Sequence, residues 1–141
     1  METGIKVGDI MKTRLISITE NSTIQQAAKI MKSKDVGSVL VTDKSKHIYG
    51  ILTDRDLVEK ALAKGLRLNT SIKTMVSKPL IGIDPSEDLS EAARLMGNED
   101  LRRLVVFKEG KVVGILSEKD IVKISPSLYD IIAEKVEGHL K

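Results

Sequence analysis

The chain has 141 residues, enough for a compact domain whose apolar core needs no disulfide or structural metal. It contains no cysteine, which excludes thiol catalysis, thiolate metal sites and a disulfide framework. Its 23 basic and 20 acidic residues are interspersed and leave a formal net charge of +3, a mild excess that favours anionic partners only weakly. The first residues lack the apolar stretch of a signal peptide, and no segment is long and apolar enough to span a bilayer. We therefore expect a cytoplasmic protein with no membrane partner.

The chain contains two copies of one sequence unit. Residues 50–57 (GILTDRDL) align with residues 114–121 (GILSEKDI) at an offset of 64 positions. Upstream, residues 24–31 align with residues 89–96 at an offset of 65, and single-residue changes in loop length account for the difference. The dipeptide at residues 10–11 aligns with residues 74–75 at an offset of 64. The two copies fill nearly the whole chain.

Each copy begins with a short alternating strand and an amphipathic helix. The predicted strands are residues 16–18 and 81–83, and each precedes a segment with apolar residues at i, i+3, i+4 and i+7. In the second copy, the sequence Asp-Pro-Ser-Glu predicts a helix start with Asp84 as N-cap and Pro85 at the first helical position.

Two further strands and a second helix complete each copy. The strands are predicted at residues 37–42 and 48–52 in the first copy, and at 104–107 and 111–116 in the second, where Glu109-Gly110 makes a hairpin turn. The second helix is predicted from Asp54 to Lys64, with Gly65 as its C-terminal cap, and its counterpart begins at Glu118.

The order of elements predicts an α/β (α+β) fold. Each unit reads β-α-β-β-α, and one unit cannot cover both faces of its own sheet, so we expect the two units to pack sheet to sheet with pseudo-twofold symmetry. Pro126 interrupts the last helix, which predicts a separate C-terminal helix over residues 127–139. Its apolar side carries Leu128, Ile131, Ile132 and Val136.

A hydroxyl residue and an acid recur where the last strand of each copy meets its helix. They are Thr53 and Asp56 in the first copy, and Ser117 and Asp120 in the second. One interpretation is a capping box, in which hydroxyl and acid bind backbone amides of the first helical turn. The other is a nucleotide site, because a helix N-terminus suits a phosphate and a carboxylate accepts both ribose hydroxyls. Repetition at equivalent positions favours the second interpretation.

At these residues the sequence resembles the CBS (cystathionine-β-synthase) domain family, in two tandem copies at residues 7–66 and 70–123. The matching segments are residues 7–11, 24–31, 37–41, 50–56, 72–75, 89–96, 101–106 and 114–120. The resemblance implies a non-enzymatic regulatory module with two symmetry-related clefts between the repeats, commonly paired into a homodimer. It implies ligands such as AMP, ADP, ATP or S-adenosylmethionine, no catalytic cofactor, and signalling to a separate, unidentified partner protein.

The resemblance also implies roles for individual residues. Asp56 and Asp120 match the ribose-binding acids of the family, and Thr53 and Ser117 match its hydroxyl positions beside ribose and phosphate.

Further matches concern the adenine and phosphate groups. Ile16 and Ile81 match the strand that lines the adenine pocket. Arg102 and Arg103 match a basic position that contacts phosphates, whereas the first copy has Gly-Ser at residues 37–38. Unequal sites are therefore expected, although the sequence does not show which cleft the arginines face. Without the repeat, solvated charges before an edge strand are the better interpretation of the arginines, and with the repeat the two interpretations are equally favoured.

Other functions find less support in the sequence. His47 and His139 have no carboxylate or second histidine at ligand spacing, so no metal site is predicted. The acids at the helix starts have no neighbouring nucleophile candidate in a strained turn, and neither a P-loop nor a metal-binding acid cluster is visible, so no catalytic residues are predicted. A nucleic-acid-associated or purely structural assembly protein is the alternative, motivated by the positive charge. The sequence lacks the features expected of a nucleic-acid-binding protein: a helix that reads bases, an aromatic platform and a basic tract.

Overall fold

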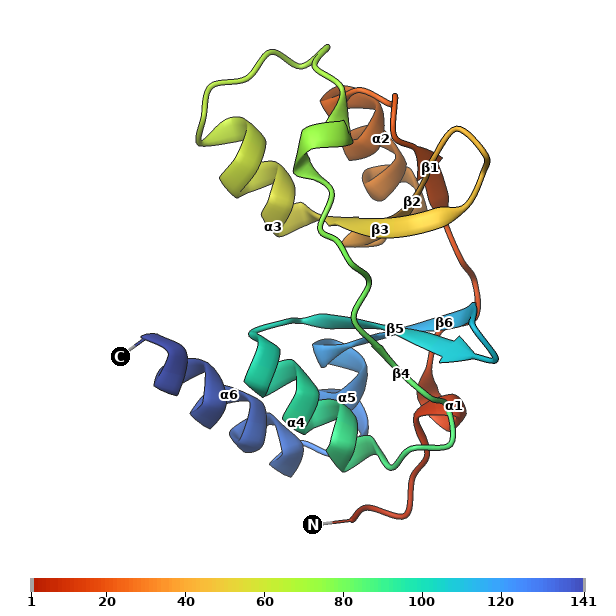
Figure 1. The fold of residues 1–141 in the computed structure, drawn as a ribbon. Coiled ribbons are helices and arrows are strands. Elements are labelled where there is room, and N and C mark those ends of the chain that lie inside the picture. Colours follow the sequence, from red (N-terminus) through yellow and green to blue (C-terminus); the bar gives the residue numbers. More distant parts are fainter. Residues whose placement is uncertain (1, 141) are drawn as a thin grey trace. The chain divides into compact units, whose positions relative to one another are not determined.

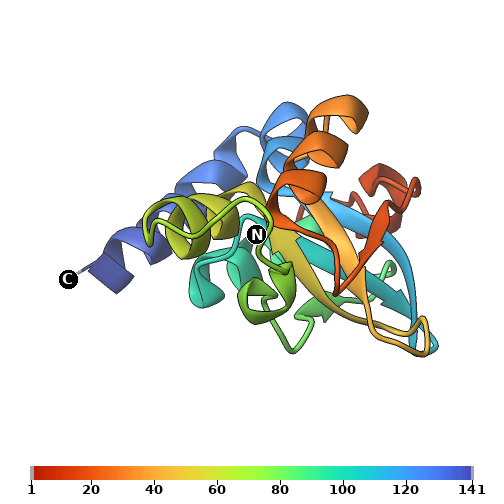
Figure 2. The same ribbon diagram turned by 90° about the horizontal axis from the view of Figure 1, so that it is seen from above.

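The computed structural model describes residues 2–140, without the side chains of residues 135–140. It divides into two compact units, which we describe separately. The first-repeat unit comprises Leu15–Leu80, and the second-repeat unit comprises Ile81–Lys141 together with Met1–Arg14. In each unit, helices cover one face of a three-stranded sheet (Figures 1 and 2).

The first-repeat unit has the predicted order of strands and helices. Its strands are β1 (Ser17–Thr19), β2 (Ser38–Thr42) and β3 (Ile48–Thr53), in the spatial order β1-β2-β3. β1 is parallel to β2, and β2 is antiparallel to β3. Helix α2 (Ile24–Lys34) buries its apolar side against Val39, Val41 and Leu52 of the sheet.

The second helix of this unit is less regular than its sequence predicts. It begins as α3 (Asp54–Leu57) and continues as a π-helical turn, η1 (Val58–Leu62), in which the Ala63 N–H donates to the Val58 carbonyl. Gly65 then takes a positive φ of 67°, in agreement with the predicted C-terminal cap. A short 3-10 helix, η2 (Ile72–Met75), closes the unit.

The second-repeat unit repeats this topology and adds the C-terminal helix. Its elements are α1 (Val7–Ile10), β4 (Gly82–Ile83), α4 (Leu89–Glu99), β5 (Arg103–Lys108), β6 (Lys111–Ser117), α5 (Glu118–Ile124) and α6 (Ser127–Leu140). β4 is parallel to β5, which is antiparallel to β6. Leu128 and Ile132 of α6 are buried in the core of this unit, and Ile131 packs against it. The side chain of Val136 lies outside the described residues.

The predicted N-cap of α4 is wrong. Asp88, not Asp84, caps the helix, and its carboxylate accepts the Ser90 N–H at 2.8 Å. Asp84 instead accepts the Ser86 N–H at 2.8 Å and its hydroxyl at 2.6 Å, which forms a local turn before the helix. Both acids fit the same cap pattern in the sequence, and the side chain that meets the first free amides decides between them.

The segment at the start of each sequence repeat belongs to the unit of the other repeat. Lys12 and Ile115 exchange two backbone hydrogen bonds of 2.9 Å, and Ser77 and Ile51 do the same at 2.9 and 3.1 Å. Since Ile51 and Ile115 are equivalent, Lys12 and Ser77 are equivalent too, at an offset of 65. The sequence alignment of this segment is therefore wrong by one residue.

The prediction that the two units pack sheet to sheet with pseudo-twofold symmetry stays a prediction.

Candidate ligand site

The junction of β3 and α3 forms the capping box that the sequence predicts. Thr53 ends the strand in an extended conformation, and its hydroxyl accepts the Asp56 N–H at 3.0 Å. In return, Asp56 Oδ2 accepts the Thr53 N–H at 2.9 Å. Asp56 is buried, with 6% of its surface exposed, so the fold holds this carboxylate in place.

The junction of β6 and α5 has the same geometry. Ser117 Oγ accepts the Asp120 N–H at 3.2 Å, and Asp120 Oδ2 accepts the Ser117 N–H at 2.9 Å. In both boxes the cap uses only Oδ2. A carboxylate oxygen has two lone pairs, so Oδ1 of each acid is left to interact with other groups. The capping interpretation and the ligand interpretation are therefore compatible.

Two residues that sequence reasoning missed contact Asp56. The Ser77 hydroxyl lies 3.1 Å from Oδ1 and 3.2 Å from Oδ2, and the Lys60 ammonium lies 3.0 Å from Oδ1. Lys60 is four residues after Asp56 on the same helical segment, a spacing that predicts an ion pair. Ser77 arrives from a distant segment, so only the fold could identify it.

The surroundings of Asp120 are different. Its Oδ1 faces the ammonium of Lys12 at 3.7 Å, and 66% of the Lys12 side chain is exposed. Lys12 occupies the position equivalent to Ser77, so a cation replaces a hydroxyl in the second junction. Lys12 was also missed by sequence reasoning, because it lies at the start of the first repeat, 108 positions before Asp120.

The strand register assigns Arg102 and Arg103 to the second junction. Arg103 lies directly opposite Ser117 in the ladder of β5 and β6, and the Arg102 carbonyl accepts the Glu118 N–H at 2.7 Å. Ser38 lies opposite Thr53 in the same way, so the register confirms that the first repeat has Gly-Ser where the second has Arg-Arg.

Ile16 and Ile81 lie at the same end of their sheets as the capping boxes. The Ile16 carbonyl accepts the Leu40 N–H at 2.9 Å, which places it beside β2, one residue along from the Ser38 and Thr53 pair. Ile81 bonds to Val105 equivalently at 3.2 Å. With strands about 4.8 Å apart, each isoleucine is about 10 Å from its hydroxyl residue across the middle strand. Both side chains are half-buried and pack against the cores.

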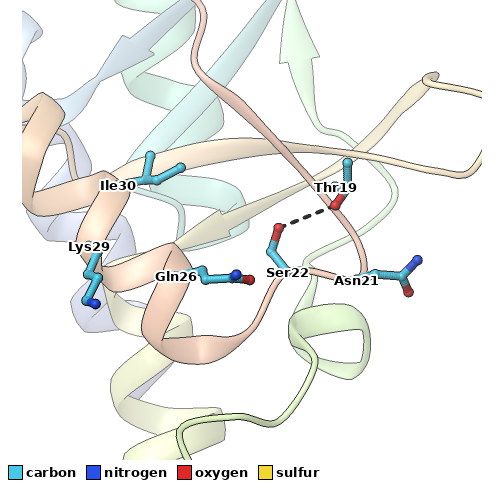
Figure 3. Close-up of a pocket in the computed structure, with 6 residues that line it drawn as sticks. All are labelled: Thr19, Asn21, Ser22, Gln26, Lys29 and Ile30. Atoms are coloured by element: carbon cyan, nitrogen blue, oxygen red, sulfur yellow. Dashed lines mark hydrogen bonds between the residues drawn. The ribbon is translucent and has the colours of Figure 1, made fainter.

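A surface pocket recurs elsewhere in each unit. In the first-repeat unit it lies where β1 leads into α2 and is lined by Thr19, Asn21, Ser22, Gln26, Lys29 and Ile30 (Figure 3). Its counterpart in the second-repeat unit includes Asp84, Glu91, Arg94 and Leu95. Neither pocket contains a predicted site residue, and both follow from the repeated strand-to-helix turn.

Two features are absent from the residues that the structure describes. Among residues 2–134, no group of three or more histidine, aspartate or glutamate side chains is placed to hold a metal ion. Over the same part of the chain that the structure describes, no helix has the length and apolar composition needed to cross a membrane.

The family model of the CBS domain matches residues 7–63 and 72–127. The CBS domain-containing protein YhcV of Bacillus subtilis is 33% identical over 115 residues, which cover 82% of this chain and 81% of that protein.

Solved structures show the same fold. Hypoxic Response Protein I, whose crystal structure has two coordinated zinc ions, gives a TM-score of 0.70 at 31% identity, with 84% of this chain and 97% of that chain covered. The CBS domain protein PAE2072 of Pyrobaculum aerophilum, complexed with AMP, gives a TM-score of 0.78 at 23% identity, with 92% and 99% covered.

Proposed function

Because the chain belongs to the CBS domain family, as a pair of CBS repeats, we propose that it is a non-catalytic regulatory module that binds an adenine nucleotide. The observation that carries the proposal is the pair of buried carboxylates, Asp56 and Asp120, each held by a capping box that uses only Oδ2. A carboxylate in this state can accept hydrogen bonds from the two hydroxyls of a ribose.

The other groups at each junction suit the remaining parts of a nucleotide. Ile16 and Ile81 offer aliphatic surface for the base about 10 Å from the hydroxyl residues, a span that fits a nucleoside. Arg103 and Lys12 belong to the second junction and supply positive charge for phosphates. This cationic setting favours AMP, ADP or ATP over S-adenosylmethionine, because the sulfonium of that ligand is itself positive.

The regulatory part of the proposal is a population shift. A nucleotide that binds one arrangement of the repeats more tightly than another changes their populations, and a separate partner protein reads the change. The AMP complex of the protein from Pyrobaculum aerophilum is a precedent for a nucleotide on this fold. Pairing of two copies, which the family resemblance implies, belongs to the proposal and is tested by sedimentation velocity.

Isothermal titration calorimetry tests the proposal. AMP, ATP and S-adenosylmethionine are titrated into the wild type and into the Asp56→Asn, Asp120→Asn double variant. Asparagine retains an acceptor for the cap but loses the charge, so the variant should stay folded by circular dichroism and lose nucleotide binding. Asp35→Asn is the control, because Asp35 is an exposed residue at the end of α2 whose left-handed conformation suits asparagine. Absence of binding by all three compounds to the wild type would contradict the proposal.

A further inference from the structure

The two candidate carboxylates differ in the groups that contact Oδ1, the oxygen that the capping box does not use. At Asp56, the Ser77 hydroxyl and the Lys60 ammonium both lie within 3.1 Å of Oδ1. At Asp120, the one group that the structure describes near Oδ1 is the Lys12 ammonium, at 3.7 Å on a side chain that is 66% exposed. The caps of the two acids are the same, so the difference lies in these neighbours alone.

The Lys60 ammonium is well held at Asp56. It lies 3.0 Å from Asp56 Oδ1, 3.2 Å from the Met75 carbonyl and 3.4 Å from Ser77 Oγ. An ammonium has three donors, and these three acceptors can use all of them. The Lys60 side chain is 37% exposed and that of Asp56 is 9% exposed, so the pair is partly shielded from solvent. A ribose that approaches Asp56 must displace a charge-assisted hydrogen bond between two held groups.

The second junction has no counterpart of this arrangement. The position equivalent to Lys60, 64 residues later, is Ile124, which has no group that binds a carboxylate. The position equivalent to Ser77 is Lys12, whose long and exposed side chain can move away at little cost. A ligand can therefore reach Asp120 without breaking a buried interaction.

We infer that Lys60 and Ser77 form an internal latch on Asp56, so that a phosphate-bearing nucleotide fills the Asp120 site first. The inference rests on the proposed function and adds the order of occupancy and the residues that set it. The charges agree with this order, because Arg103 and Lys12 both belong to the Asp120 junction whereas the first repeat has Ser38 opposite Thr53. The Asp56 site binds nucleotide only when the Lys60 ammonium moves away from the Asp56 carboxylate.

Calorimetry with AMP on single variants tests the latch. In the wild type we expect one tighter site, which Asp120→Asn weakens by about tenfold or more and Asp56→Asn leaves within about twofold. In the Asp120→Asn background, Lys60→Met should tighten the remaining site by about tenfold, because the carboxylate no longer has to give up its ammonium. Ser77→Ala should act in the same direction with a smaller effect. Because it removes no charge, it is the second variant to use if Lys60→Met fails to fold.

Lys64→Met is the matched control, since Lys64 is an exposed lysine that follows the same helical segment. It should leave both sites unchanged.

Three other outcomes would contradict the order of occupancy, the latch or the proposed function, each separately. Two equal sites in the wild type, or a tighter site that is lost with Asp56→Asn, overturns the order of occupancy while nucleotide binding stands. Weaker AMP binding at the Asp56 site in Lys60→Met overturns the latch, because it would mean that Lys60 contacts the ligand. If AMP, ATP and S-adenosylmethionine all fail to bind to the wild type, the proposed function itself fails.

Discussion

At the residue scale, two glycines allow the connecting segments to lie against the sheets. A Cβ on Gly50 would overlap the Val76 side chain and approach the Ser77 carbonyl oxygen to 2.8 Å, and one on Gly114 would meet Met11 Sδ at 2.5 Å. Glycine at both positions leaves room for another chain segment to cross directly over the strand. The same segments carry Ser77 and Lys12, so these glycines also position the neighbours of the two acids.

Gly50→Ala should therefore destabilise the first-repeat unit by about 1–3 kcal/mol, the usual cost of overpacking. Urea unfolding monitored by circular dichroism measures the change. Gly110→Ala is the comparison: it lies in a turn with a φ of 78° and nothing within 4 Å of the added methyl, so only backbone strain of about 1 kcal/mol is expected. No destabilisation at Gly50 would show that the Val76 segment moves freely.

The sequence revealed part of the site at this scale. The capping boxes at Thr53 and Ser117 could be predicted because strand, hydroxyl and acid are contiguous and occur twice. The contacts of Asp56 with Ser77 and of Asp120 with Lys12 could not, since they join residues 21 and 108 positions apart. Such contacts depend on which segment folds onto which sheet, and local periodicity carries no information about that.

At the element scale, Asp88 joins helix α4 to the start of the chain. Besides the Ser90 N–H, its carboxylate accepts the Ser90 hydroxyl at 2.7 Å and the backbone N–H groups of Thr3 and Gly4 at 3.1 and 2.9 Å. Hydrogen bonds from the Ser90 side chain, and then from the backbone of Ser90, Thr3 and Gly4, hold the pKa of Asp88 well below its usual range.

The lowered pKa gives a prediction about acid stability. A carboxyl whose pKa is lower in the folded state contributes stability that is complete above its unfolded pKa of about 3.9 and is lost as the pH falls through the folded pKa. Asp88→Asn should therefore destabilise the protein at pH 7, and the difference from the wild type should shrink below about pH 4. Urea unfolding at pH 7 and pH 3 measures both differences, with Asp35→Asn as control. A difference that does not depend on pH would show that the charge of Asp88 is irrelevant.

Element boundaries were less predictable than element order. The strands and both helices of each repeat follow the predicted order, because alternation and helical periodicity are strong signals over these lengths. The π-helical turn at Val58–Leu62 and the cap at Asp88 were missed. Both depend on which of several neighbouring backbone groups find a partner, and sequence spacing alone leaves that choice open.

At the scale of the whole molecule, the boundaries of the compact units differ from those of the sequence repeats. The segment at the start of each repeat packs in the unit of the other repeat. Ile72, Met75 and Val76 follow the first repeat as read from the sequence, yet all three are buried in the core of the first-repeat unit. Val7 is fully buried in the core of the second-repeat unit, although it begins the first repeat. Periodicity shows that two copies exist, but not which unit each connecting segment joins.

Fragments of the chain should therefore fold according to the units. A fragment of residues 15–80 contains the whole core of the first-repeat unit, whereas a fragment of residues 1–69 lacks three of its buried side chains. Loss of buried Ile or Met side chains costs about 2–5 kcal/mol each, which can exceed the stability of so small a unit. We expect cooperative thermal unfolding by circular dichroism for the 15–80 fragment and none for the 1–69 fragment. Cooperative unfolding of the 1–69 fragment alone would show that residues 72–76 contribute little to the core that positions Asp56.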